Sequence, residues 1–489
     1  MLFLWVHAQQ VAHWDGLIAT GAGKDPWSRS GADEFQMILG ILASGDKCSL
    51  PWQDAPVFFC NHWPHSVGKP VQSVLTNGRG LLGVFCSSNF IQKRHVIANP
   101  MNQAASEDSL HASVSLAMEL IRCPSIAPED GGAQSILTNR LEATGFDVKR
   151  IERAGVQSLY AESGTRGPLM LFAVHSDVVP PGDVCDWTSL PFQPEIRHGL
   201  LFGRGAADMK GPLSCAVVAA EKFVQEHPDM PMRVGFIVAG DEEPANNHGT
   251  TDVLEWLHSQ GKKVDYCVVT EPTSAERFGD TIKVGRRGSI NGHLTIHGLQ
   301  GHAAYPQHAV NPVHRSLWVL HTLAERNWDE GDAHFPPAGF QITNVSAGTG
   351  ANNVIPGRFN VSFNIRHGPS LTVEKVESLV KDAMGMAGLS YELAAKSDAI
   401  PFLTEEGPFT ELCSKAIEEV SGLRPDHATG GGTSDARFIA PHCPHLVEFG
   451  LVGKTSHQVD EHVAVTEMEQ LSEVYGRMLR KLAGYVEGQ

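Results

Sequence analysis

The stretch LMLFAVHSD, residues 169–177, indicates the fold class, because six apolar residues are followed by a histidine and, two residues later, an aspartate. Two later stretches have the same form, an apolar run that ends in acidic residues: RVGFIVAGDEE (233–243) and DYCVVTE (265–271). Helical patterns precede the second stretch and separate it from the third. Strands that alternate with helices predict an α/β layer with a largely parallel sheet.

The three apolar runs each deliver a metal-competent side chain to the carboxyl end of a predicted strand. These are His175 with Asp177, then Glu242 with Glu243, then Glu271. In open α/β sheets ligands bind at this edge, so the side chains are candidates for one common site. A single Asp after a strand is more often a turn or cap residue, so it is the set that indicates a site.

Two further candidates lie outside the strands. Asp208 stands in the glycine-rich loop GRGAADMKGP (203–212), just before a predicted helix, where the ordinary role of an Asp is an N-cap. His457 stands in KTSHQVDEH (454–462), and in a chain with 24 His a loop histidine is usually only solvated. With His175, Glu243 and Glu271 they supply two imidazoles and three carboxylates.

That donor set suits a pair of zinc ions. Two Zn²⁺ about 3.5–4 Å apart can polarise an amide carbonyl and activate a bridging water. Such a pair needs one bridging carboxylate and imidazole or carboxylate ligands on either side. Glu242 is left over as a candidate general base. Asp177 can accept the second ring N–H of His175 and fix its tautomer.

Composition excludes several classes of protein. With 489 residues the chain should form two to four domains, and 42% hydrophobic with 19% charged residues is typical of globular proteins. A net charge of -17 argues against nucleic acid as a partner, although local arginines can still bind anionic substrates. We find no apolar run long enough to span a bilayer, so no membrane partner is expected.

Cysteine use and the N-terminus indicate a cytoplasmic protein. The nine cysteines include no C-x-x-C pair, which argues against a disulfide framework. The opening MLFLWV is too short for a signal-peptide core and has no basic residue before it.

Residues 1–105 differ in texture from the rest. Five of the nine Trp lie there, and turn formers are scattered through stretches such as GAGKDPWSRSG and NHWPHSVGKP. One interpretation is a small accessory domain, a disordered arm or a peptide-binding surface. We favour another, in which Met101 is the natural start and the preceding stretch is an over-extended gene model.

The texture changes again near residue 288. In RFNVSFNIR (358–366) apolar and polar residues alternate, as in half-buried antiparallel strands. We therefore expect an inserted α+β domain at 288–400 between two parts of one α/β domain, 106–287 and 401–489. Helices are predicted at 110–121, 132–145, 311–327 and 371–386, and the α/β pattern returns at 404–421 and 466–485.

Several motifs resemble, in order and spacing, the dinuclear zinc family of aminoacylases, deacetylases and carboxypeptidases, and within it the succinyl-diaminopimelate desuccinylases. The resemblance covers about residues 108 to 485 and leaves 1–100 outside. The matching strings are HSDVVPPGD (175–183), GRGAADMKG (203–211), GDEEP (240–244), TEPTS (270–274), VGRRGS (284–289), HGLQGHAAYP (297–306), GTGANNVIPG (348–357), GGTSDARF (431–438) and TSHQVDE (455–461).

The resemblance implies a role for each matching residue. His175 and Glu271 would hold one zinc, Glu243 and His457 the other, and Asp208 would bridge them, with a cis peptide bond after it. Cobalt or manganese tolerates the same ligands. Glu242 would be the general base, and His302 would reach across a homodimer to stabilise the oxyanion. Substrate-binding positions would be Arg286, Arg366, Asn352, Gly432 and Thr433, with Tyr305 and Ser289 as weaker candidates.

The implied fold is a mixed-sheet α/β catalytic domain with helices on both faces, interrupted by an α+β dimerisation and lid domain. The implied activity is hydrolysis of N-succinyl-LL-2,6-diaminopimelate, a small substrate with three carboxylates that arginine forks could hold. Arginine on strand edges is also a common surface residue, and a turn explains Asn352 equally well. A related deacetylase or carboxypeptidase would use the same ligands, whereas a non-catalytic relative would have lost one of them.

Overall fold

The computed structural model describes residues 110–244 and 248–489, together with two short strands nearer the N-terminus. These strands, β1 (Ser73–Thr76) and β2 (Leu82–Phe85), pair antiparallel. The chain divides into the units Met1–Asn99 and Pro100–Gln489, and the second contains all the other described elements. Met101, the expected start, lies outside the described residues.

The larger sheet has eight strands in the order β19-β10-β20-β9-β5-β8-β4-β3. Its centre is parallel, since β5 pairs in parallel with both β8 and β9, and β9 with β20. A hairpin of β3 and β4 continues it antiparallel at one edge, which makes the sheet mixed as expected. The strands are β3 (Asp147–Arg153), β4 (Val156–Ser163), β5 (Leu169–His175), β8 (Arg233–Ala239), β9 (Tyr266–Val269), β10 (Thr281–Lys283), β19 (Asp426–Ala428) and β20 (His445–Glu448).

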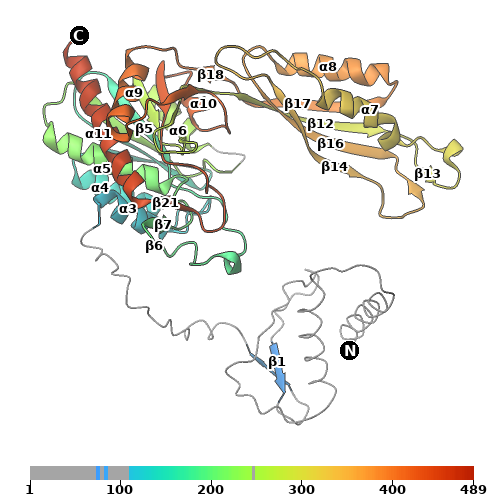
Figure 1. Cartoon of the computed structure of the whole chain (residues 1–489), viewed down its shortest axis with the longest axis horizontal. Coiled ribbons are helices and arrows are strands. Elements are labelled where there is room, and N and C mark those ends of the chain that lie inside the picture. The colour runs from blue at the N-terminus through green and yellow to red at the C-terminus, as the bar shows by residue number, and fades with distance from the viewer. Residues whose placement is uncertain (1–72, 77–81, 86–109, 245–247) are drawn as a thin grey trace, which may run out of the picture. The chain divides into compact units, whose positions relative to one another are not determined.

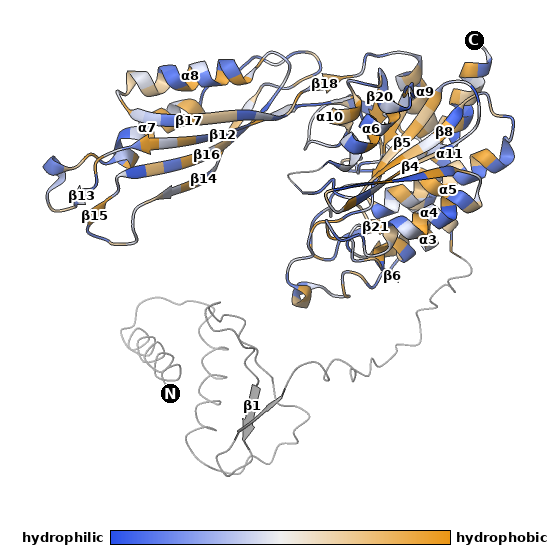
Figure 2. Ribbon diagram, turned by 180° about the vertical axis from the view of Figure 1, so that it is seen from behind, coloured by the Kyte–Doolittle hydropathy of each residue, from blue (hydrophilic) through white to orange (hydrophobic). Residues whose placement is uncertain are grey.

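Helices cover both faces of this sheet (Figure 1). Alternate residues of β5 point to opposite sides: Phe172 packs into the cluster that contains most of the helices, and Leu171 into the cluster beneath α6 and α10. Both positions are fully buried, which explains why the central strands are apolar throughout (Figure 2). The helices are α3 (Ala112–Ile121), α4 (Ala133–Ala143), α5 (Lys210–Glu226), α6 (Gly249–Ser259), α9 (Pro408–Ser421), α10 (Ala436–Ile439) and α11 (Val465–Glu487).

A second, antiparallel sheet has the strand order β14-β16-β12-β17. The helices α7 (Pro312–Ala324) and α8 (Val373–Met386) pack on one of its faces around Val361, Phe363 and Ile365. The alternation predicted for 358–366 is confirmed, because these apolar residues are buried and their polar neighbours are only partly so. The strands are β12 (Gly288–His297), β14 (Gly339–Ala347), β16 (Arg358–His367) and β17 (Ser390–Ala399).

Smaller pairings complete the fold and include the segment after the last predicted metal ligand. The strand β21 pairs with β7, and β7 with β6. The remaining short elements are η4 (Val184–Asp186), β6 (Glu195–Arg197), β7 (Leu200–Phe202), β11 (Gly285–Arg286), β13 (Gly301–His302), η5 (Pro306–His308), β15 (Val354–Ile355), β18 (Phe402–Leu403) and β21 (His462–Ala464).

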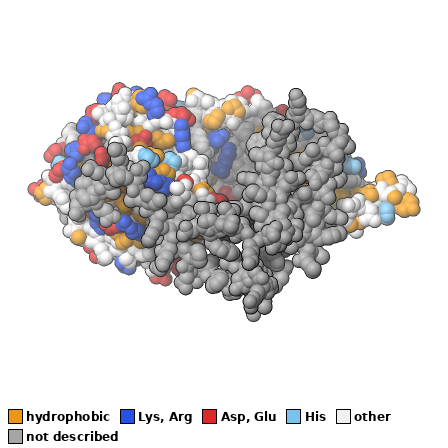
Figure 3. All heavy atoms as spheres, turned by 60° about the horizontal axis from the view of Figure 1, so that its bottom comes forward, with side chains coloured by type: hydrophobic (Ala, Val, Ile, Leu, Met, Phe, Trp, Pro, Cys, Tyr) orange, Lys and Arg blue, Asp and Glu red, His pale blue; other side chains and the backbone are white. Residues whose placement is uncertain are grey.

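On the face in Figure 3, acidic and basic side chains are interspersed over the described part of the surface. Within residues 110–244 and 248–489, no helix combines the length and the apolarity that a membrane crossing requires.

Candidate metal centre

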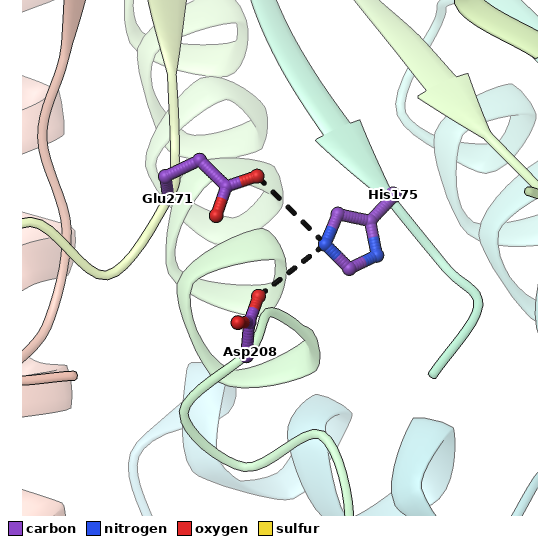
Figure 4. Close-up of side chains that lie close together, drawn as sticks. All are labelled: His175, Asp208 and Glu271. Atoms are coloured by element: carbon purple, nitrogen blue, oxygen red, sulfur yellow. Dashed lines mark ion pairs between the residues drawn. The ribbon is translucent and has the colours of Figure 1, made fainter. Parts of the chain in front are cut away.

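The carboxyl ends of β5 and β9 bring the first cluster together. His175 is the last residue of β5, and Glu271 follows β9 by two residues. The His175 Nε2 atom lies 3.4 Å from Asp208 Oδ1 and 3.9 Å from Glu271 Oε1 (Figure 4). His175 Nε2 is buried and has no hydrogen-bond partner. An unpartnered imidazole nitrogen that faces two carboxylates fits a metal ligand.

A second cluster shares Asp208 with the first. His457 Nε2 lies 3.3 Å from Asp208 Oδ2 and 3.1 Å from Glu243 Oε1. In each cluster the candidate ligand atoms lie within 4.8 Å of one another. Asp208 therefore offers one carboxylate oxygen to each cluster, which is the arrangement that a bridging ligand requires.

Two roles were considered for Asp208, N-cap of the helix that follows and metal ligand, and the position of its backbone distinguishes them. The helix α5 has Met209 as its N-cap residue, without a side-chain cap hydrogen bond. The Asp208 carboxylate thus faces the two histidines instead of capping the helix. The Asp208–Met209 peptide bond is cis, as the resemblance implied.

Asp177 supports the site differently from the way we expected. Its backbone carbonyl, not its carboxylate, is the nearest acceptor for His175 Nδ1, at 3.0 Å, and the carboxylate oxygen lies 3.5 Å away. That carboxylate accepts the backbone N–H of Glu242 at 3.0 Å and of Glu243 at 3.1 Å. Asp177 therefore ties the strand that carries His175 to the loop that carries the two glutamates.

The crowded charges shift the pKa values of the clustered groups. Burial lowers the pKa of His175, but the nearby carboxylates of Asp177 and Asp208 outweigh it and hold the pKa well above its ordinary value. Hydrogen bonds to Asp208 and Glu243 raise the pKa of His457 to about 10. Burial raises the pKa of Asp208, yet its ion pairs with the two histidines leave that pKa well below the usual range.

The other two carboxyls shift in the opposite direction. Burial and then the charge of Asp208 hold the pKa of Glu271 well above its ordinary value. Burial and then the charge of Asp435 do the same for Glu242. Without a cation the site gathers more negative charge than its surroundings can solvate, which is the electrostatic situation that bound metal ions relieve.

A cavity of about 820 Å³ opens beside these groups. Glu242 and Glu243 line it together with Thr433, which lies between β19 of the larger sheet and α10. Arg366 and Ser289, on the polar face of the second sheet, line it as well. Burial and then the charges of Arg287 and Arg437 lower the pKa of Arg366, and Arg437 lines the cavity as well.

Arg286 is placed differently from the open fork that we expected. It is buried, and its Nε donates to Glu448 Oε1 at 2.8 Å while Nη2 pairs with Glu448 Oε2. Its Nη1 donates to the carbonyl of Gly432 at 3.2 Å. Both edges of the guanidinium thus form hydrogen bonds, and Arg286 holds the loop of Gly432 and Thr433 through the Gly432 carbonyl.

His302, Tyr305 and Asn352 lie away from the clusters. All three are exposed, and the rings of His302 and Tyr305 are 5.5 Å apart. None of them lines the cavity beside Glu242. Figure 1 places β13, which carries His302, at the end of the second sheet that is farther from the larger domain. Within one chain the structure does not bring these residues to the metal clusters.

Sequence reasoning missed two buried carboxylates that hold the site in place, Glu448 and Glu461. Glu448 pairs with Arg286, and Glu461 pairs with Arg204. Glu461 stands only four residues after His457, in a string that we had singled out. A charged residue between apolar neighbours, as in HLVEF (445–449), was the only available signal for Glu448.

Comparison with known proteins identifies the family of this chain. Residues 171–481 match the model of Peptidase family M20/M25/M40. A succinyl-diaminopimelate desuccinylase of Thioalkalivibrio sulfidiphilus is 46% identical over 370 residues, which cover 76% of this chain and 98% of that protein. One from Thiobacillus denitrificans is 45% identical over 380 residues, 77% of this chain and 97% of that protein.

Solved structures share the fold at low identity. An M20 family metallo-carboxypeptidase of Sulfolobus solfataricus superposes with a TM-score of 0.63 at 17% identity, over 77% of this chain and 100% of that one. A dinuclear metal-binding peptidase of Bacillus subtilis gives a TM-score of 0.58 at 18% identity, over 77% and 98%. The chain therefore belongs to Peptidase family M20/M25/M40 and, within it, to the succinyl-diaminopimelate desuccinylases.

Proposed function

We infer that this protein is a metal-dependent amidohydrolase that cleaves N-succinyl-LL-2,6-diaminopimelate to succinate and LL-2,6-diaminopimelate, a step in lysine and diaminopimelate biosynthesis. The observation that carries the inference is identity of about 45% to desuccinylases across nearly their full length. The clustered donors in the matching motifs supply the chemistry that such a hydrolase needs.

We propose that each subunit holds two zinc ions, with cobalt as an alternative in one site. His175 and Glu271 would bind one ion, Glu243 and His457 the other, and Asp208 both. The unpartnered Nε2 atom of His175 and the division of the Asp208 oxygens support this assignment. Bound zinc would polarise the amide carbonyl and lower the pKa of water at the site.

Three observations support Glu242 as a proton carrier. It lines the cavity, it is not a member of either ligand cluster, and its backbone N–H is fixed by Asp177. We propose that its carboxylate accepts a proton from the attacking water and then delivers it to the leaving amine nitrogen of the substrate. Asp177 would keep the carboxylate in reach by holding the loop.

The cavity suits a substrate with several carboxylates. Arg366 supplies a guanidinium on its wall, and Ser289 and Thr433 supply hydroxyls. We propose that these three bind the substrate directly. We propose that Arg286 acts through Gly432, because its fork is engaged by Glu448.

We also propose a homodimer in which residues 288–400 form the dimerisation and lid domain and 106–287 with 401–489 form the catalytic domain. The strand β14 is an edge of its sheet and is exposed along nearly its whole length, including Val345 at 60%. The neighbouring α7 exposes Trp318 at 49%. A sheet edge with exposed apolar groups is a surface that a second copy could cover.

Dimerisation would also explain His302, which is exposed and remote from the clusters of its own chain. We propose that it stabilises the developing oxyanion in the partner subunit, with Tyr305 and Asn352 beside it on the substrate. We further propose a cytoplasmic location, because the six cysteines among the described residues are all free thiols.

Hydrolysis of N-succinyl-LL-diaminopimelate, measured beside N-acetylornithine, tests the proposed reaction. We expect the zinc-loaded protein to cleave the succinyl substrate with much the higher kcat/KM. A preference for the acetyl substrate would instead make the protein a deacetylase of the same family.

A further inference from the structure

Glu461 is a fully buried carboxylate that binds the backbone of the Asp208 loop. Its Oε1 accepts the backbone N–H of Ala207 at 2.9 Å and of Asp208 at 3.0 Å. Its Oε2 accepts the N–H of Gly205 at 3.0 Å and the Nη1 of Arg204 at 2.6 Å. Three backbone N–H groups of this loop and the Arg204 side chain thus converge on one carboxylate from the far end of the sequence.

The same pair also holds the segment that carries His457. The Gly203 N–H donates to the backbone carbonyl of Glu461 at 2.9 Å, and Arg204 Nη2 reaches the carbonyl of His457 at 3.4 Å. Arg204 is only 2% exposed, and its guanidinium lies 5.1 Å from the ring centroid of Trp187. The Arg204–Glu461 pair therefore joins the two loops whose side chains meet in the second cluster.

The His457 segment needs such a restraint. His457 has φ +64°, in the left-handed region that a histidine rarely adopts, and its side chain is half exposed. Packing alone therefore holds this ligand weakly. Tertiary hydrogen bonds must select its conformation, and those that reach the Asp208 loop fix the two ligands relative to each other.

The burial of two charges makes a merely structural role a poor explanation. A buried ion pair is costly to desolvate, and apolar residues of similar size usually stabilise a fold as well or better. The carboxylate instead accepts the backbone N–H groups of Gly205, Ala207 and Asp208, the last of which is the residue that would serve two ions. Its geometry suits the orientation of ligands.

We propose that Glu461, paired with Arg204, is a positioning residue that presets the separation of Asp208 and His457 and so sets the zinc affinity of the cluster Asp208–Glu243–His457. This inference rests on the proposed two-zinc site. The first cluster should depend on it less, because strands β5 and β9 position His175 and Glu271.

Zinc titration of the metal-free protein against a chromogenic chelator tests the proposal. In Glu461→Gln an amide NH₂ faces backbone donors, so we expect one of the two zinc equivalents to bind about 10–100-fold more weakly. Excess zinc should restore much of the lost turnover. Arg204→Lys, which keeps the charge and leaves the backbone hydrogen bonds to Glu461, should show a smaller loss and serves if Glu461→Gln does not fold.

Asp460→Asn is the matched control. Asp460 lies beside Glu461 and accepts from Thr188 N at 2.8 Å and Thr188 Oγ1 at 2.6 Å, outside the metal clusters. Both zinc affinities of the Asp460→Asn variant should equal those of the wild-type protein. The proposal is overturned if folded Glu461→Gln and Arg204→Lys bind both zinc ions with wild-type affinity. It is also overturned if Asp460→Asn loses as much zinc affinity as Glu461→Gln. Wild-type protein that binds no zinc would instead overturn the proposed function, and this inference with it.

Discussion

At the scale of single residues, the site is held together by a few side chains that each make more than one contact. Asp208 presents one oxygen to each histidine, and Asp177 divides its two oxygens between the N–H groups of neighbouring glutamates. Two adjacent glutamates therefore have separate environments. Both line the cavity, but Glu243 pairs with His457, whereas Glu242 belongs to neither ligand cluster.

This separation predicts different effects for the same substitution at adjacent positions. Glu242→Gln should lower kcat by about 10²–10⁴-fold, because the proton carrier is lost, while both zinc ions still bind. Glu243→Gln should weaken zinc binding itself. Steady-state kinetics with zinc affinity for each variant distinguish the two. Equal loss of zinc from both variants would show that Glu242 is a ligand.

The pKa shifts predict a proton-linked metal affinity. The pKa of His457 is raised to about 10, mainly by its hydrogen bonds to Asp208 and Glu243, so in the metal-free protein the ring is protonated at pH 7. A zinc ligand must be neutral, so binding should release protons and tighten as pH rises toward 10.

The stability of the metal-free protein should depend on pH in the opposite direction to its metal affinity. Because the folded pKa of His457 exceeds the ordinary 6.5, its contribution to metal-free stability is complete below pH 6.5 and lost as pH rises through about 10. Calorimetric zinc titrations in buffers of different ionisation enthalpy measure the released protons. Binding heats that are independent of the buffer would contradict the predicted release of protons on zinc binding.

At the scale of elements, the sequence predicted those parts that local pattern determines. The runs 169–175, 233–239 and 266–269 are apolar because both faces of a central strand are buried, and their ends carried the ligand candidates to one edge. Strands β14 and β17 were not predicted, because β14 lacks a buried stripe and β17 is largely polar.

Partners that are distant in sequence could not be predicted. Arg286 and Glu448 are 162 residues apart, and only the folded chain shows that the guanidinium is engaged. Its expected role as an open fork was an inference from residue type, which cannot reveal a buried counter-ion. Likewise, the grouping of His302 with Tyr305 and Asn352, remote from the metals, depends on the direction in which the second sheet extends.

The Arg286–Glu448 pair gives a prediction about stability. Glu448→Ala leaves a buried guanidinium unpaired and should cost about 3–5 kcal/mol of unfolding free energy. Urea denaturation of the metal-free protein measures this. The control is Glu411→Ala, which removes an exposed partner of Arg424 and should cost about 0–1 kcal/mol. Similar losses in both variants would mean that burial does not set the cost.

At the scale of the whole molecule, two copies should be needed for activity. A charge at the exposed edge of β14, as in Val345→Lys, should separate the dimer and lower turnover, because His302 then has no partner site. Zinc affinity should remain. Val184→Lys alters another exposed valine, in η4, and should leave the dimer intact. Light scattering with activity assays decides, and a fully active wild-type monomer would refute the dimer.

The central claim is that two metal ions and this donor set hydrolyse a succinyl amide. Zinc titration into metal-free protein, with succinate release followed at each addition, tests it most directly. We predict no turnover without metal and a rise to a plateau as two equivalents per chain bind. Turnover by the metal-free protein, or two bound zinc ions without any succinate release, would contradict the account.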